Sequence, residues 1–363
     1  MSKRVKIYYV AELNLPSNSA YSIHVMKMCE AFSKLNHDVN LFVIKKKNIN
    51  KINKIYNINY KFKIFSIFNN FLMLNFIFRI FFTFKILLKK TEKDALFLSR
   101  SIIFSLIACL FSKRIILELH HEITGFSKII YWLFKNLNLI ENLKFIFLSK
   151  NLNHVYKINK EKYLVLDDAV NIDDFKKKRQ IKYKNTCVYI GGFFEGKGVE
   201  QIFRLAKKNK NIYFHIYGEK KYLRAKEKGK NIKVFNYVNY SEIPRILSRY
   251  DVALMPYQRK VQGRGTIWLQ KYMSPLKMFD YMAAKMIIIA SNLKVYKHIL
   301  KNNFNCILVD INEDEKWSKT IKLAFKKNYK NRFLKRNAYK TAKKYSWDNR
   351  CQKIINFFEK KFN

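Results

Sequence analysis

Short apolar runs alternate with longer helical patterns along most of the chain, and this alternation constrains the fold more than any other feature of the sequence. Strands that alternate with helices form parallel sheets whose faces are covered by those helices. In the first half, strands are predicted over Val5–Val10, Val39–Ile44, Ala95–Ser99, Ile115–Leu119, Phe145–Leu148 and Tyr163–Leu166. Helices are predicted between them over Ser22–Asn36, Ser101–Phe111, Lys128–Leu137 and Lys150–Lys157.

The second half begins the same alternation again. Its predicted strands are Thr186–Ile190, Ile212–Tyr217, Ile232–Phe235, Val252–Met255, Met286–Ala290 and Cys306–Val309. Two full series are too many for one compact sheet, and 363 residues fit two domains of ordinary size. The sequence therefore predicts an α/β chain of two doubly wound domains. We place their join near Phe175–Lys182, where the basic run 176–179 is interpreted as a solvated linker.

The charge is strongly unbalanced, with 72 Lys and Arg against 26 Asp and Glu and a net charge of +46. Two interpretations stay open: lysine is used as a general surface residue, or the charge attracts an anionic membrane or nucleic acid. The lysines are spread through both halves, which disfavours a dedicated nucleic-acid surface. The five cysteines form no CxxC pair, so neither a zinc site nor a disulfide framework is predicted, and a reducing cytoplasm fits. The basic N-terminus leads straight into a strand, and we identify no signal peptide.

The segment Phe71–Leu88 is nearly all apolar, but Asn75, Arg79 and Thr83 recur at helical spacing and form one polar stripe. A membrane-spanning helix would tolerate Arg79 at its centre poorly, at a cost of about 2.5–3.5 kcal/mol. Two interpretations remain: a helix packed on the first sheet with its polar stripe in water, or a helix lying in a membrane interface with Arg79 among the headgroups. Nearby basic residues favour a membrane surface. They are Lys85, Lys89, Lys90 and Lys93.

A glycine-rich turn, Tyr189–Gly198, follows a predicted strand and opens a helix. Glycines at such a turn allow the backbone to approach an anion, and the helix N-terminus offers free N–H groups. Lys197 would add a positive charge suited to a diphosphate. The alternative is that these glycines serve packing alone. The pattern is neither GxGxxG nor a P-loop.

A second motif covers Ser274–Lys285, where Pro275 suits the first helical turn and Ser274 is predicted to cap it. Lys277 and Asp280 are three residues apart and share a helix face. Lys277 and the free N–H groups could meet at one anion, and Asp280 could accept hydrogen bonds from a ribose. The alternative is an ordinary surface ion pair.

The stretch Ser274–Asn292 closely resembles the signature of retaining glycosyltransferases of family 4, which have the GT-B fold, and Asp280 stands at the last position of their E-x7-E motif. The resemblance extends over nearly the whole chain in the family's order. It includes Val5–Val43, Ile116–Glu122, Val165–Phe175, Tyr189–Glu200 and Tyr345–Asp348. It implies two Rossmann-like domains facing each other across a cleft: an acceptor-binding domain over 1–176, a nucleotide-sugar-binding domain over 177–344, and a helix over 345–363 that returns to the first.

The resemblance also implies roles for individual residues. Lys197 would hold the donor diphosphate, Asp280 the ribose, and His120 would lie beside the transferred sugar. The implied catalytic residues are His120 and Lys197, and the implied donor-binding residues are Gly191, Gly192, Lys197, Ser274, Lys277, Asp280, Ser17 and Ser19. Two positions depart from the family: Tyr272 replaces the first acidic residue, and no Arg precedes the glycine–lysine pair near Gly192-Phe193.

The implied reaction moves a sugar from a nucleotide-sugar donor to an acceptor hydroxyl with retention, in cell-envelope glycan or glycolipid synthesis. Helix N-termini and lysines would stabilise the departing diphosphate, so no metal or cofactor is expected. The expected partners are the donor, a glycan or lipid-linked acceptor, and an anionic membrane surface, without specific nucleic acid. The expected location is the cytoplasm or the inner face of the membrane. The alternatives are a sugar-nucleotide epimerase or phosphorylase of the same fold, or a basic membrane- or nucleic-acid-binding protein without catalysis.

The remaining polar residues give weaker signals. Asp167-Asp168 and Asp173-Asp174 resemble an acidic metal motif, but they lie where the segment between the domains is expected. Six histidines lack metal-ligand spacing and are expected to be structural or on the surface: His24, His37, His121, His154, His215 and His298. Arg264, Trp268 and Tyr272 lie in a long loop that could touch the donor or the acceptor.

Overall fold

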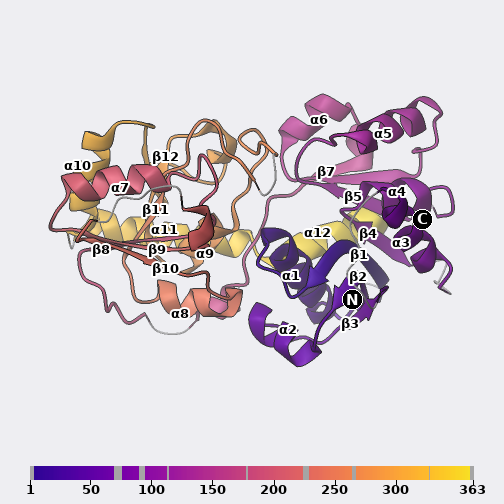
Figure 1. The fold of residues 1–363 in the computed structure, drawn as a ribbon, viewed down its shortest axis with the longest axis horizontal. Helices are drawn as coiled ribbons and strands as arrows, with labels where there is room; N and C mark the ends of the chain where they lie inside the picture. The colour runs from indigo at the N-terminus through magenta and orange to yellow at the C-terminus, as the bar shows by residue number, and fades with distance from the viewer. Residues whose placement is uncertain are drawn as a thin grey trace. The chain divides into compact units, whose positions relative to one another are not determined.

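The computed structural model describes residues 4–68, 76–89, 95–112, 114–176, 179–223, 229–263, 267–326 and 328–359. The chain divides into two compact units, the first made of Met1–Asp167 and Trp347–Asn363 and the second of Asp168–Ser346. Each unit holds one parallel β-sheet flanked by helices (Figure 1). The predicted pair of Rossmann-like α/β domains is therefore confirmed.

The first unit is built on a seven-stranded sheet with the order β3-β2-β1-β4-β5-β6-β7. The strands are β1 Lys6–Leu15, β2 Asp38–Lys46, β3 Lys63–Ser66, β4 Leu96–Ser99, β5 Ile115–Leu119, β6 Leu143–Phe147 and β7 Tyr163–Val165. The helices are α1 Ala20–Lys34, α2 Ile49–Tyr56, α3 Phe76–Leu87, α4 Ile102–Ala108, α5 Phe126–Asn136, α6 Lys150–Tyr156 and α12 Trp347–Glu359. The order reverses between β1 and β4, as in doubly wound folds.

The second unit has a six-stranded sheet with the order β10-β9-β8-β11-β12-β13. The strands are β8 Thr186–Ile190, β9 Tyr213–Tyr217, β10 Ile232–Phe235, β11 Val252–Met255, β12 Ile287–Ser291 and β13 Ile307–Val309. The helices are α7 Val199–Lys208, α8 Ile243–Leu247, α9 Leu276–Ala283, α10 Asp314–Ala324 and α11 Tyr329–Lys344. The central strands are buried throughout, which explains why they appear in the sequence as continuous apolar runs.

The segment after the first unit differs from the predicted solvated linker. The Arg179 guanidinium donates a hydrogen bond of 2.7 Å to the carbonyl of Lys285 and forms an ion pair of 3.2 Å with Asp251. The backbone N–H groups of Gln180 and Lys182 also donate hydrogen bonds to backbone carbonyls just after α8. Residues 179–183 are thus packed on the second unit; Lys177 and Lys178 lie outside the described residues.

Helix α3 forms within the predicted apolar segment, but its polar stripe does not face water. Arg79 forms an ion pair of 3.3 Å with Glu12 of β1, and Thr83 is fully buried with its hydroxyl donating to the Arg79 carbonyl. Both interpretations of the stripe, in water or among lipid headgroups, are therefore wrong for Thr83, whereas Arg79 is paired with Glu12 and keeps 33% of its side chain exposed. Asn75 lies outside the described residues, as do Lys90 and Lys93. In the described part of the chain, no helix combines the length and hydropathy needed to cross a bilayer.

The C-terminal helix α12 is anchored in the first unit by a buried arginine. The Arg350 guanidinium lies 2.6 Å from the Glu118 carboxylate of β5 and donates a second hydrogen bond of 3.0 Å to the carbonyl of Leu166. Both side chains are almost completely buried. This contact ties the last helix to the centre of a sheet formed more than two hundred residues earlier.

Removing one partner of this pair should destabilise the first unit. We expect Arg350→Met to lower its free energy of unfolding by about 3–5 kcal/mol, because the Glu118 charge would lose its main buried counterion. Urea unfolding followed by circular dichroism measures the effect. Lys353→Met on the exposed face of the same helix is the matched control, and equal midpoints for the two variants would contradict this role of Arg350.

Candidate functional site

The glycine-rich turn between β8 and α7 is fixed by backbone geometry that a side chain would not allow. Gly196 and Gly198 have φ of +74° and +82°, in the left-handed region. A Cβ at Gly196 would lie 1.7 Å from the Lys260 carbonyl oxygen, and one at Gly198 would lie 1.8 Å from that of Pro256. The turn therefore packs directly against the backbone that follows β11. Lys197 lies between the two glycines, next to the N-terminus of α7.

Lys197 and Lys277 come together on a pair of tyrosine rings at the carboxyl ends of β8 and β11. The Lys277 Nζ lies 3.5 Å from the ring centroid of Tyr189 and 5.3 Å from that of Tyr257. The Lys197 Nζ lies 5.0 Å from the same Tyr257 ring. The π faces attract both ammonium groups and hold them close together. Gly191 makes room for this arrangement, because a Cβ there would lie 2.4 Å from the Lys277 Nζ.

Neither of these two lysines forms an ion pair in the part of the chain that the structure describes. The Lys277 Nζ is buried and forms no hydrogen bond there. Burial lowers the pKa of Lys197 to about 8. Burial and the nearby Lys197 charge lower the pKa of Lys277 further, against the opposing effect of Asp280. Two neighbouring, partly buried cations that form no ion pair are costly, so this site favours an anionic ligand.

Asp280 and Ser274 lie near the lysines, but with other partners than the sequence predicts. Asp280 is buried and accepts a hydrogen bond of 3.2 Å from the Tyr240 hydroxyl. Pro275, not Ser274, is the N-cap of α9, and no side chain caps this helix. The predicted cap is therefore wrong: the Ser274 hydroxyl instead accepts a hydrogen bond of 3.1 Å from the Asp168 backbone. No side chain therefore caps the first turn of α9, although its Met278 N–H donates to the Pro275 carbonyl at 2.9 Å.

The positions that depart from the family have structural roles of their own. Tyr272, at the first acidic position, is buried beside the second sheet. The Gly192 carbonyl accepts a hydrogen bond of 2.9 Å from the Tyr189 hydroxyl, which orients that ring under Lys277. Tyr189 and Tyr257 were not singled out in the sequence, because an aromatic residue next to a strand is far more often part of a core. Arg264 lies outside the described residues.

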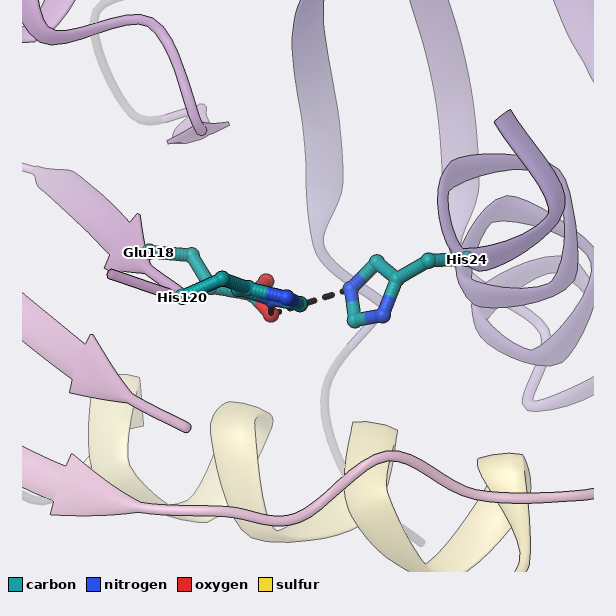
Figure 2. A group of neighbouring side chains, drawn as sticks. All are labelled: His24, Glu118 and His120. Carbon is teal, nitrogen blue, oxygen red and sulfur yellow. Dashed lines mark hydrogen bonds and ion pairs between the residues drawn. The ribbon is translucent and has the colours of Figure 1, made fainter. Parts of the chain in front are cut away.

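In the first unit, His120 belongs to a buried network centred on one carboxylate oxygen (Figure 2). Oε1 of Glu118 lies 2.6 Å from the His120 Nε2, 2.6 Å from the Arg350 guanidinium and 3.0 Å from the His24 Nε2. His24 comes from α1, and its ring lies edge-on to the rings of His120 and Trp347. Three distant segments therefore fix the imidazole of His120 at the carboxyl end of β5.

The protonation states in this network follow from burial and charge. Burial alone would raise the pKa of Glu118, but His24, Arg350 and the hydrogen bonds from the histidines hold it well below its usual value. Burial and the Arg100 charge lower the pKa of His120 to about 3, against the opposing effect of Glu118. His120 is therefore neutral at neutral pH and donates its Nε2–H to an ionised carboxylate. Its Nδ1 is left as a hydrogen-bond acceptor.

His24, Glu118 and His120 bring potential metal-ligand atoms within 4.8 Å of one another. The geometry nevertheless does not suit a cation. The Glu118 oxygen that would coordinate it is already 2.6 Å from the Arg350 guanidinium, whose positive charge would repel a metal ion. The cluster is better described as a carboxylate held by three nitrogen donors.

The remaining predicted residues of the first unit are engaged in local hydrogen bonds. The His121 Nδ1 lies 2.7 Å from the Glu122 carbonyl, so its ring is held away from the Glu118 network. Ser19 is the N-cap of α1, where its hydroxyl accepts from the Ser22 backbone at 3.1 Å. The hydroxyls of Ser17 and Ser19 are 2.9 Å apart. These serines therefore shape the N-terminus of α1, and their role towards a donor stays a prediction.

His24, Arg350 and Arg100 were missed as members of the candidate site. His24 and Arg350 lie 94 or more positions from their partner Glu118 in the sequence, so no local pattern signals them. Arg100 could have been found in the sequence, because it directly follows the β4 strand. In the structure its guanidinium lies 4.3 Å from the ring centroid of Tyr21. Glu118 also gave a signal, since it and His120 are two residues apart and point to the same side of a strand.

Comparisons with known proteins agree with this architecture. Residues 171–341 match the family model of the glycosyl transferases group 1. No curated protein sequence matches the chain. A glycosyltransferase from Rickettsia africae ESF-5 is similar in structure, with 14% identity, a TM-score of 0.74 and coverage of 99% of this chain and 100% of that one.

Two similar structures contain bound nucleotide. Anabaena HepE in complex with UDP and glucose shares 12% identity, with a TM-score of 0.71 over 98% of this chain and 100% of that one. A mutant of S. aureus TarM in complex with fondaparinux, α-GlcNAc-glycerol and UDP shares 13% identity, with a TM-score of 0.72 and coverage of 99% of this chain and 100% of that one. Residues 171–341 thus match the glycosyl transferases group 1 model, and the two Rossmann-like units of the chain have the fold of GT-B glycosyltransferases.

Proposed function

We propose that this protein is a retaining glycosyltransferase that moves a sugar from a nucleoside-diphosphate sugar to the hydroxyl of a glycan or lipid-linked acceptor, in cell-envelope glycan or glycolipid synthesis. The observation that carries the proposal is the pair of partly buried lysines, Lys197 and Lys277, which form no ion pair with the described residues and lie beside two helix N-termini. The glycosyl transferases group 1 match over 171–341 and the nucleotide-bound structures of similar fold support it.

The second unit would bind the donor. Both ammonium groups and the first-turn N–H groups of α7 and α9 would contact the diphosphate, with Gly191 and Gly192 allowing close approach. Asp280 would accept hydrogen bonds from the ribose. During transfer, negative charge builds up on the departing diphosphate, and cations in a dry site stabilise it most strongly at that moment. Lys197 would thus act in catalysis as well as in binding.

In the first unit, His120 would orient the transferred sugar. Its neutral imidazole, held by Glu118 through Nε2, offers Nδ1 to a sugar hydroxyl that donates a hydrogen bond. This role needs no covalent intermediate on the histidine. We further propose that the protein works in the cytoplasm or at the inner face of the membrane, because a lipid-linked acceptor would be presented there.

Donor binding gives the most direct test of the lysine site. Titration of wild-type protein with a panel of uridine, guanosine and cytidine diphosphate sugars should identify one that binds. For that donor, Lys197→Ala should remove a charge-assisted contact of about 1.5–3 kcal/mol and weaken affinity by about tenfold or more. Asp280→Asn should also weaken binding. Isothermal titration calorimetry measures both.

The matched control is Lys260→Ala, which removes an exposed lysine from the loop packed against the same glycine turn. It should leave donor affinity within about twofold, because exposed charges are screened by solvent. If the folded Lys197 and Asp280 variants bound the donor as well as wild type, the nucleotide-sugar assignment of this site would be lost.

The lowered pKa of Lys197 predicts a pH dependence with a defined sign. A bound diphosphate favours the ammonium form, so binding should be strongest below pH 8 and weaken as pH rises through about 8, where the free side chain loses its proton. Binding near pH 8 should take up protons, which calorimetry in buffers of different ionisation enthalpy detects. The Lys197→Ala variant should lack this component. Affinity that stays constant from pH 7 to pH 9.5 would contradict it.

The two neighbouring histidines should differ in their effect on turnover. His120→Ala should lower the turnover number by about a hundredfold with nearly unchanged donor affinity, because the lost contact acts mainly in the transition state. His121→Ala, whose ring bonds to the Glu122 carbonyl, should do much less. Steady-state kinetics with donor binding measured in parallel separates the two. The opposite ranking would assign the functional position to His121.

A further inference from the structure

Helix α3 exposes one stripe of apolar side chains to the surroundings. Ile77, Phe81, Phe84 and Leu88 are 63%, 62%, 43% and 81% exposed, and their spacing of four, three and four residues places them on one stripe. The opposite side of the helix buries its other apolar side chains and carries Arg79 with its Glu12 partner and the fully buried Thr83. A surface helix of a protein in water normally carries polar side chains on its exposed side. The exposed stripe of α3 is therefore suited to an apolar environment.

Two neighbouring elements continue this stripe. On α5 and at its C-cap, Phe126, Ile129, Leu133 and Leu137 are all more than half exposed and recur at helical spacing. Directly after α4, Leu110 and Phe111 are also exposed, the latter by 70%. We call these ten side chains on α3, α5 and the end of α4 the apolar face.

Direct contacts join the three elements into one surface. The rings of Phe76 and Phe126, at the starts of α3 and α5, lie edge to face with centroids 4.9 Å apart. At the other end, the Cys109 thiol donates a hydrogen bond of 3.4 Å to the Leu139 carbonyl and so links the ends of α4 and α5. Helix α4 packs against both α3 and α5, as Figure 1 shows. An exposed apolar surface of this extent marks an interaction site.

The charged residues on the helices of the apolar face are all of one sign. Helices α3, α4 and α5 contain no Asp or Glu. Lys85 and Lys89 are exposed beside the stripe of α3, and Lys128 is exposed beside that of α5. Trp132 of α5 is half-buried with the Lys135 ammonium 4.8 Å from its ring centroid. Apolar and aromatic side chains flanked by lysines match the boundary between lipid tails and anionic headgroups.

We propose that the apolar face docks this protein on an anionic lipid membrane. The Phe, Ile and Leu side chains would enter the layer below the headgroups, and the lysines would contact lipid phosphates. The absence of acidic residues on these helices favours lipid over a second copy of this basic chain, whose lysines would repel at a shared interface. The inference deepens the proposed function, since docking would bring the enzyme to a lipid-linked acceptor.

Vesicle co-sedimentation of the full chain tests the proposal without any catalytic step. Wild type should bind vesicles of phosphatidylcholine with 25% phosphatidylglycerol and should bind pure phosphatidylcholine vesicles much less. Its binding to the anionic vesicles should weaken in high salt. The double variant Phe81→Gln/Ile129→Gln should lose about tenfold or more in vesicle affinity. The double variant Lys85→Gln/Lys128→Gln should lose several-fold in vesicle affinity, and its binding should depend less on salt. Both pairs are exposed, and circular dichroism checks that the variants fold.

The matched control is Leu323→Gln, an exposed leucine on α10 of the second unit, which should bind vesicles as wild type does. Equal vesicle binding by the Phe81/Ile129 variant and wild type would overturn the proposal, as would no binding of wild type to anionic vesicles. A wild-type dimer in light scattering that the same variant abolishes would assign the face to a second copy and also overturn it. Donor binding measured in parallel is independent of this surface, so failure of docking and failure of the transferase assignment can be told apart.

Discussion

A parallel sheet gathers the carboxyl ends of all its strands on one edge, and both candidate sites of this chain depend on that constraint. In the first unit, Arg100 follows β4 and His120 follows β5. In the second, the glycine turn follows β8, and Tyr257 follows β11. Residues far apart in the sequence are brought together because neighbouring strands end at the same level.

The two sites handle buried charge in opposite ways. The Glu118 carboxylate is surrounded by nitrogen donors from three segments, so its charge is compensated within the first unit and contributes to its stability. The ammonium groups of Lys197 and Lys277 lie over aromatic rings and form no ion pair among the described residues, and a ring attracts a cation far more weakly than a carboxylate in contact would. A fixed charge network suits a residue that must keep one orientation, whereas uncompensated cations suit a ligand that brings its own negative charge.

Helix α3 shows how one interaction can reverse a sequence interpretation. Seen alone, a stripe of Arg and Thr on an apolar helix belongs in water or among headgroups. The Glu12 carboxylate at the edge of β1 offers Arg79 a partner inside the unit, and the helix turns its polar side inward to reach it. The consequence is that phenylalanines and leucines face outward, which gives the first unit a surface unlike that of an ordinary Rossmann-like domain.

The sequence by itself determined the two α/β domains, most of their strands, and the turns that carry Gly191, Lys197, Lys277 and His120. These features are local: they follow from the period of apolar residues and from the turn chemistry of glycine and proline. The short edge strand β3 carried too little of that pattern to be predicted. Only the tertiary structure decided which partner each charge meets, as with Arg350 and Glu118, Arg179 and Asp251, or the lysines and their tyrosine rings. Such pairs depend on how sheets and helices stack, and no spacing along the chain encodes them, because the partners lie many tens to hundreds of residues apart.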